Sequence, residues 1–158
     1  MLYGIMGTFK DFGAFTPLQL WTGGDGSQSD TGDLMVVPAH RLAGRIILDD
    51  GQSIPPETRL FVGLHGAWDT LELEVDKDGN FDTTGIPSGL IRVSLRVPGY
   101  RVSRKNDSQD VLNPNCLVGS VSDDMTNLVI LMEKGARQDR NYDSLHDECC
   151  LLYTSRCV

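Results

Sequence analysis

The fold is decided by residues 41–100, which read RLAGRIILDDGQSIPPETRLFVGLHGAWDTLELEVDKDGNFDTTGIPSGLIRVSLRVPGY. Apolar and polar residues alternate within short runs, as they do in strands with one buried face. Residues 71–75, LELEV, show this alternation most clearly, with acidic residues on the polar face. Asp-Gly, Pro-Pro, Pro-x-Gly and Pro-Gly sequences separate the runs, and such sequences form turns. The pattern predicts a small antiparallel β-sandwich.

Two further apolar runs, residues 117–121 and 128–132, extend the pattern beyond residue 100. Together the runs predict about seven strands between residues 41 and 133, which suits a single seven-stranded, Greek-key sandwich. We expect residues 128–132 to be buried on both faces, because the run is continuously apolar. Residues 103–115 are polar and are expected to form a long loop.

Three local features refine this prediction. Asp78-Gly79 is a strong hairpin signal, and Phe81 is expected to point into the core. Glu72 and Glu74 are expected to face Arg92 and Arg96 across neighbouring strands, because opposite charges on paired strands stabilise a sheet.

Outside the sandwich, composition divides the chain into segments. Residues 1–33 are Gly-rich and irregular, and we interpret them as a linker or the tail of a preceding module. Residues 34–135 form the predicted domain, and residues 136–158 are expected to be a disordered tail. Residues 150–155, CLLYTS, resemble a translated sequencing adaptor, so residues 150–158 are expected to be an artefact. The alternative is a genuine cysteine-rich tail.

Charge and composition exclude several classes of protein. The chain has 158 residues and a net charge of −8, which argues against nucleic-acid binding, since a phosphate backbone requires clustered Lys and Arg. No apolar run is long enough to cross a bilayer, and no signal peptide is visible. Of the four cysteines, Cys116 is expected to be a small buried apolar residue, and no Cys and His spacing is typical of zinc sites.

A set of turn and strand motifs occurs in an order that resembles a known family. The motifs are Gly44-Arg-Ile46, Asp50-Gly51, Ile54-Pro-Pro56, Asp78-Gly-Asn-Phe81, Ile86-Pro-Ser-Gly89 and Val97-Pro-Gly-Tyr100. Over roughly residues 34–135 the chain resembles the carboxypeptidase regulatory-like domain family. These are prealbumin-like sandwiches related to collagen-adhesin B-type repeats and to carbohydrate-binding-like folds.

The resemblance implies a non-catalytic domain in a periplasmic or extracellular protein, used as a spacer, stalk or accessory module. The chain departs from the family in the long polar loop at residues 104–114. Lys77 and Lys105 lie in a predicted turn and loop, so we expect no intramolecular isopeptide bond of the kind found in some adhesin repeats.

Aromatic residues in loops are the candidates for ligand binding. Trp68, beside Asp69, is predicted to lie between two strands, where an exposed indole would stack on a sugar ring. Trp21 and Tyr100 are further candidates. The alternative is that Trp68 covers the open end of the core, and that the ring of Tyr100 covers the core edge.

Oxygen-bearing side chains at one turn are a weak candidate metal site. Asp76, Asp78, Asn80 and Asp82 are spaced like part of a calcium loop. A distant bidentate Glu is missing, and alternate residues of a hairpin point to opposite faces. We therefore favour a simple Asp-Gly turn, with no metal and no cofactor.

No nucleophile is indicated by the sequence. His40, His65 and His146 are scattered, and no arrangement of Ser, Cys and His suggests a nucleophile with a base. The sequence therefore predicts a non-catalytic accessory, spacer or protein-interaction module, whose partners are neighbouring domains of the same polypeptide. The alternative is a carbohydrate-binding module that uses loop aromatics, with a glycan as its ligand.

Overall fold

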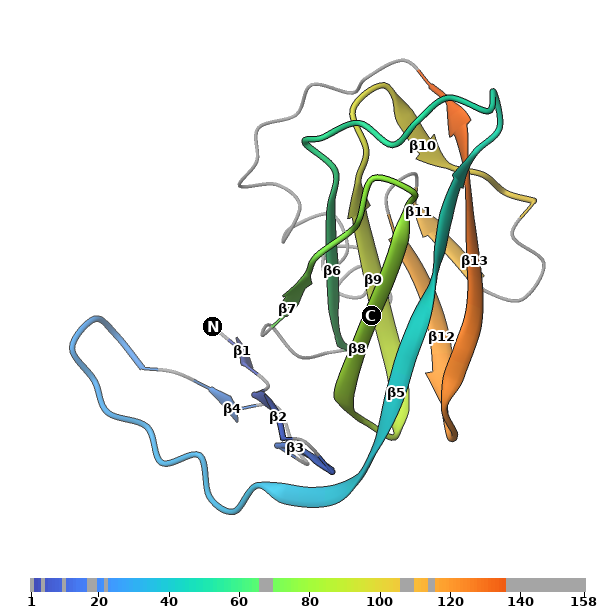
Figure 1. Ribbon diagram of the computed structural model, residues 1–158. Helices are drawn as coiled ribbons and strands as arrows, with labels where there is room; N and C mark the ends of the chain where they lie inside the picture. The colour runs from blue at the N-terminus through green and yellow to red at the C-terminus, as the bar shows by residue number, and fades with distance from the viewer. Residues whose placement is uncertain are drawn as a thin grey trace.

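A computed structural model describes residues 2–3, 5–9, 11–16, 20–21, 23–65, 70–105, 110–113 and 116–135. All of the regular secondary structure among these residues is β-strand (Figure 1). The strands form a six-stranded sheet, a five-stranded sheet and a two-stranded pair. The two larger sheets enclose one apolar core, so the all-β sandwich predicted from the sequence is confirmed.

The six-stranded sheet is built around one long strand, β5. Its order is β10 (Tyr100–Val102), β13 (Met125–Lys134), β5 (Met35–Leu48), β3 (Phe12–Phe15) and β2 (Met6–Thr8), and β8 (Asn80–Pro87) also pairs with β5. The five-stranded sheet has the order β11 (Asp110–Asn113), β12 (Cys116–Val121), β9 (Gly89–Arg96), β6 (Arg59–Leu64) and β7 (Leu71–Leu73). The two-stranded pair joins β1 (Leu2–Tyr3) to β4 (Leu20–Trp21).

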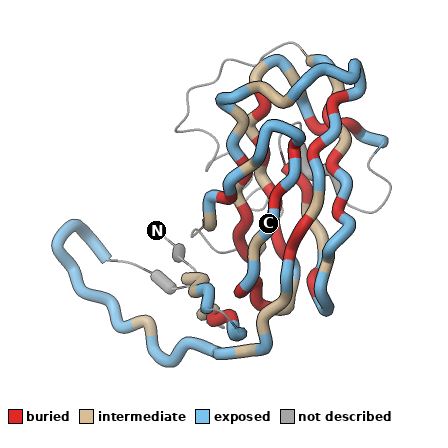
Figure 2. The backbone as a smooth tube through the Cα atoms, viewed as in Figure 1, coloured by how far each residue is buried: buried red, intermediate tan, exposed pale blue. Residues whose placement is uncertain are grey.

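The core follows the period-two patterns of the sequence. Phe81 is buried as predicted, and so is Cys116. The buried side chains alternate with exposed residues along the strands (Figure 2). The fully buried residues of largest volume include Leu42, Ile46, Leu60, Ile86, Ile91, Leu95, Leu117, Ile130 and Met132.

Strand β13 is not buried on both faces, and that prediction is wrong. Val129 is 51% exposed, whereas Ile130 is completely buried. The strand has one face on the core and one on the surface, since the second sheet covers only its inner side. A continuously apolar run is therefore not sufficient to predict that both faces of a strand are buried.

One pair of strands is parallel, although the sequence suggested an antiparallel sandwich. β13 pairs with β5 in parallel, with Leu128 opposite Gly44 and Met132 opposite Leu48. Parallel neighbours require a long connection, and the whole of the chain between residues 48 and 125 supplies it. The other pairings in the two large sheets are antiparallel.

More strands are present than predicted. β10 begins directly after the Pro-Gly corner and pairs with β13, and this pairing places Val102 in the core. β11 lies within the predicted polar loop and pairs with β12. β5 also runs through Pro38, at a point where it pairs with β3 and before its pairing with β13 begins at Leu42.

The predicted charge pairs between β7 and β9 are not formed, because β6 lies between these strands. Glu72 lies opposite Phe61, and Arg59 Nη1 is 3.5 Å from Glu72 Oε1. The alternating run at residues 71–75 was correctly predicted to contain a strand. The partner of that strand, β7, is β6 and not β9.

Residues 1–33 contain strands that pair with the sandwich. β3 pairs with residues 35–38 of β5, and β2 pairs with β3. Gly13 packs directly on Pro87, where an added Cβ would lie 2.6 Å from the proline Cβ. The division of the chain at residue 34 stays a prediction, as does that of the C-terminal tail, since residues 136–158 lie outside the described residues.

Candidate functional site

Of the four residues predicted to bind a ligand, only Tyr100 has a described side chain. Trp68 and Asp69 lie outside the described residues. Trp21 lies in β4, opposite Leu2 of β1, and its side chain is outside the description. A binding role for these residues stays a prediction.

Tyr100 connects three segments at one end of the sandwich. Its hydroxyl donates a hydrogen bond to Asp50 Oδ2 at 2.8 Å, and Lys134 Nζ lies 3.1 Å from the same oxygen. Its ring packs against the core, as expected from the sequence. Tyr100 begins β10, Asp50 follows β5 and Lys134 ends β13, so the three polar groups connect the ends of these strands.

The electrostatics of this cluster favour its charged form. Burial raises the pKa of Asp50, but hydrogen bonds from Tyr100 and the Gln52 amide, together with Lys134, outweigh burial and lower that pKa below its usual range. The hydrogen bond to Asp50 raises the pKa of Tyr100 and also that of Lys134. Asp50 is therefore a carboxylate at neutral pH, held between a phenol and an ammonium group.

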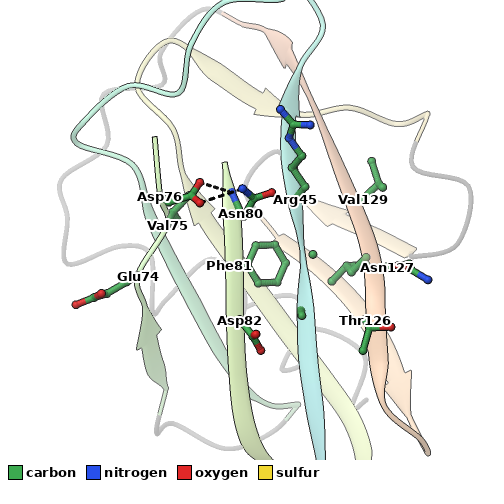
Figure 3. A pocket seen from close by; sticks show the side chains of 13 residues that line it. Arg45, Glu74, Val75, Asp76, Asn80, Phe81, Asp82, Thr126, Asn127 and Val129 are labelled. Carbon is green, nitrogen blue, oxygen red and sulfur yellow. Dashed lines mark hydrogen bonds between the residues drawn. The ribbon is translucent and has the colours of Figure 1, made fainter. Parts of the chain in front are cut away.

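The candidate metal residues are divided between two hydrogen-bond networks. Asp76 Oδ1 accepts hydrogen bonds from the amides of Asp78 (2.9 Å) and Asn80 (2.8 Å), and Asp76 Oδ2 accepts one from Asn80 Nδ2 at 2.9 Å (Figure 3). Asp82 instead forms a two-point contact with the guanidinium of Arg41. Among the described residues, no group of three or more His, Cys, Asp or Glu side chains could hold a metal ion.

The Asp-Gly turn at this position is formed, but it does not close a hairpin. Gly79 has φ of 86° and its amide donates to the Asp76 carbonyl at 2.9 Å. The flanking strands β7 and β8 belong to different sheets, so the turn is a corner between the two layers. The hydrogen bonds from Asn80 and from the backbone lower the pKa of Asp76, and the contact with Arg41 lowers that of Asp82.

An open hollow of about 680 Å³ lies beside this turn, over β8, β5 and β13. Its polar lining comes from Arg45, Glu74, Asp76, Asn80, Asp82, Thr126 and Asn127 (Figure 3). Arg45 Nε donates to the carbonyl of Asp78 at 2.9 Å, while Asp76, Asn80 and Asp82 form the bonds given above. These four side chains are therefore part of the corner and of its contact with β5.

His40, Ser88 and Asp124 meet at the opposite end of the sandwich, which the sequence did not indicate. His40 Nε2 is 2.7 Å from Ser88 Oγ, while His40 Nδ1 is 3.9 Å from Asp124 Oδ1. A catalytic base is oriented by a direct hydrogen bond to its acid, and 3.9 Å exceeds hydrogen-bond range. Asp124 Oδ1 instead accepts the amide of Arg41 at 2.8 Å.

The arrangement therefore joins β5 to the turns that precede β9 and β13. No local spacing could have revealed it, because 48 residues separate His40 from Ser88.

Exposed apolar side chains gather around the first strands and the start of β5. They are Phe9, Phe12, Leu34, Met35 and Val36, with exposed fractions between 41% and 60%. Clustered apolar side chains on a surface commonly mark a contact with another protein or domain.

Comparisons with known proteins add information on the fold alone. No family model matches the chain. No curated protein matches it either. The solved structures that are similar include a DUF3823 family protein from Parabacteroides merdae and GBS52, the minor pilin of Streptococcus agalactiae. Both are β-rich domains.

The first is 16% identical, with a TM-score of 0.39, over 61% of this chain and 46% of that one. The second is 10% identical, with a TM-score of 0.46, over 84% of this chain and 63% of that one. The chain thus spans less than two thirds of either structure. The resemblance to the carboxypeptidase regulatory-like family is not confirmed by these matches and stays a prediction.

No helix in the described part of the chain is long and apolar enough to span a membrane.

Proposed function

We propose that this chain provides a non-catalytic β-sandwich module that spaces, or presents, neighbouring domains of a larger extracytoplasmic protein. The proposal includes a periplasmic or extracellular location, which rests on the family resemblance of the sequence motifs.

The positions at which the chain enters and leaves the sandwich carry this proposal. β5, whose start also pairs with β3, runs inward from one end of the sandwich, and after the seven intervening strands β6 to β12 the chain completes β13 at the other end (Figure 1). β5 has 14 residues, and β13 ends two residues beyond Met132, which lies opposite Leu48, so the two ends are separated by at most about 50 Å at the usual rise of a strand. A module whose chain enters and leaves at opposite ends holds whatever precedes it apart from whatever follows it.

The surface chemistry supports the same function. The exposed apolar residues lie at the entry end, where they suit contact with a neighbouring part of the same polypeptide. Asp50, Asp76 and Asp82 are each bonded to groups that hold corners or strand ends together. These acidic residues thus have structural partners.

A distance measurement on the full chain tests the spacer proposal. Spin labels are attached through noncanonical amino acids at Leu34 and Lys134, both exposed, which avoids the native cysteines. We expect one narrow distance distribution below about 55 Å. A broad distribution, matching that of the same chain in denaturant, would overturn the proposal.

Carbohydrate binding remains the alternative. It depends on Trp68 and Asp69, which lie outside the described residues.

A further inference from the structure

We propose that β5 and β13 form a shear clamp, through which the sandwich resists tension applied along the chain. This inference rests on the proposed spacer function, because a spacer between two domains transmits any force that separates them. The clamp is a property of how the two strands are paired, and it requires no ligand.

The direction of force follows from the parallel pairing. Tension on the preceding chain acts first on the short strands β2 and β3, which pair with the start of β5, and then pulls that start outward at one end. Tension on the following chain pulls the end of β13 outward at the other end (Figure 1). The two strands are neighbours, so they are forced to slide past each other lengthwise. In parallel pairs the hydrogen bonds are evenly spaced, and sliding stretches all of them together. Pulling the strands apart from one end would break the same bonds one after another.

The register between the strands is continuous where the clamp is formed. Residues 44–48 pair one to one with residues 128–132. The set of inward-facing side chains is fully buried on both strands, and it comprises Ile46, Leu48, Leu128, Ile130 and Met132. Sliding by one residue would turn each of these side chains to the outer face of the sheet. The apolar core therefore resists the same displacement as the hydrogen bonds.

Both strands are interior strands of their sheet. β8 pairs with residues 39–45 of β5, and β10 pairs with residues 132–134 of β13. Each flanking strand therefore supports one end of the clamp, so that neither end of the pair is a free sheet edge.

Additional bonds connect the strands at each end of the clamp. At the entry end, the carboxylate of Asp124, beside the start of β13, accepts the amide of Arg41 in β5. At the exit end, the amide of Asp49 donates to the carbonyl of Met132 at 2.9 Å. Lys134 is paired with Asp50, as described above. Force that reaches Lys134 is thereby shared with the segment that follows β5.

Single-molecule stretching of the full chain in two directions tests the clamp. Handles at Leu34 and Lys134 load β5 and β13 in shear. Handles at Gln52 and Lys134 hold the ends of β5 and β13 that lie side by side, and they separate the strands from that end. Noncanonical amino acids at these exposed positions avoid the native cysteines.

We expect the unfolding force to be about twofold or more higher with the first pair of handles, because forced unfolding follows the barrier along the direction pulled. Equal forces, or a higher force with the second pair, would overturn the clamp. Both arms carry a handle at Lys134 and so lose its ion pair with Asp50 equally, which leaves the direction of pulling as the difference between them.

A pair of variants separates the clamp from general stability. Gly44→Ala disturbs the contact between β5 and β13, whereas Leu95→Ala removes a buried side chain from β9 in the other sheet. With forces compared at matched loss of equilibrium stability, Gly44→Ala is expected to lower the shear force more. A larger loss for Leu95→Ala would contradict the clamp.

If Gly44→Ala does not fold, the comparison of unfolding forces in the two pulling directions, made without a core substitution, still tests the clamp. If the spin-label distance is narrow but the two forces are equal, the clamp fails and the spacer proposal survives.

Discussion

Gly44 of β5 and Leu128 of β13 lie so close together that a Cβ atom at Gly44 would overlap the carbonyl oxygen of Leu128. The contact occurs where the register between the two strands shifts, between Met125 and Leu128. Only glycine leaves room for the second backbone at this point. The parallel pair that joins the beginning and the end of the sandwich thus depends on one missing side chain.

Gly44→Ala is expected to destabilise the protein. The added methyl group meets backbone, which moves less readily than a side chain, and overpacking of this kind costs about 1–3 kcal/mol or more. Urea unfolding followed by fluorescence measures the change. Gly24→Ala is the control, because nothing lies within 4 Å of a Cβ at that position, and it is expected to change stability by less than about 0.5 kcal/mol. Equal effects of the two substitutions would mean that β5 and β13 are not in this contact.

Two adjacent residues of β13 are expected to respond differently to truncation. Ile130→Ala removes a completely buried side chain and is expected to cost about 2–5 kcal/mol. Val129→Ala acts on the outer face, where the side chain is half exposed, and is expected to cost about 0.5 kcal/mol or less. Thermal unfolding of both variants measures the difference. Similar losses would restore the view that both faces of this strand are buried.

Within residues 41–133 the sequence predicts most of the strands, but it predicts their partners poorly, for a physical reason. Alternation records whether a side chain faces the core, so the inward positions of β5 and β6 could be read directly from it. Alternation does not show which strand lies alongside, and the predicted pairing of β7 with β9 was therefore wrong. The parallel pairing of β5 with β13 joins residues such as Gly44 and Leu128 that are far apart in the sequence. Only the complete fold brings them together.

The candidate sites divide along the same line. The Asp-Gly turn at Asp76 was predictable because its bonds lie within four residues. The hydrogen bond between His40 and Ser88, and that between Tyr100 and Asp50, span long stretches of chain. Polar contacts of this kind leave no periodic or local signal in the sequence, and they could therefore not be predicted from it.

Stability is expected to fall at acid pH, because several carboxylates have lowered pKa values in the folded protein. The bonds from Asn80 lower the pKa of Asp76, the contact with Arg41 lowers that of Asp82, and the hydrogen bond from Ser103 is the main contribution that lowers the pKa of Glu133. A folded-state pKa below the unfolded value means that the unfolded chain binds more protons. The stabilisation is complete above the unfolded values of about 4 and is lost as the pH falls through the folded ones.

Melting temperatures measured from pH 6 down to pH 2 test this dependence. Asp76→Asn is expected to flatten the acid limb of the curve, since it removes one of the carboxylates with a lowered pKa. Asp78→Asn is the matched control, because it removes a carboxylate from the same turn and leaves the bonds to Asp76 in place. A curve for Asp76→Asn as steep as that of the unmodified protein would show that this turn does not contribute.

Isothermal titration with a panel of soluble glycans distinguishes the spacer from a carbohydrate-binding module. A spacer is expected to give no heat with any glycan. Heat that disappears in Trp68→Ala would support the alternative, because an indole offers a large, rigid apolar face on which a sugar ring can stack. Tyr100→Phe is the informative companion, since it keeps the ring and removes only the hydroxyl bonded to Asp50. It is expected to lower the melting temperature slightly and to leave any glycan heat unchanged. Heat that is the same in Trp68→Ala and in the unmodified chain would exclude Trp68 from binding.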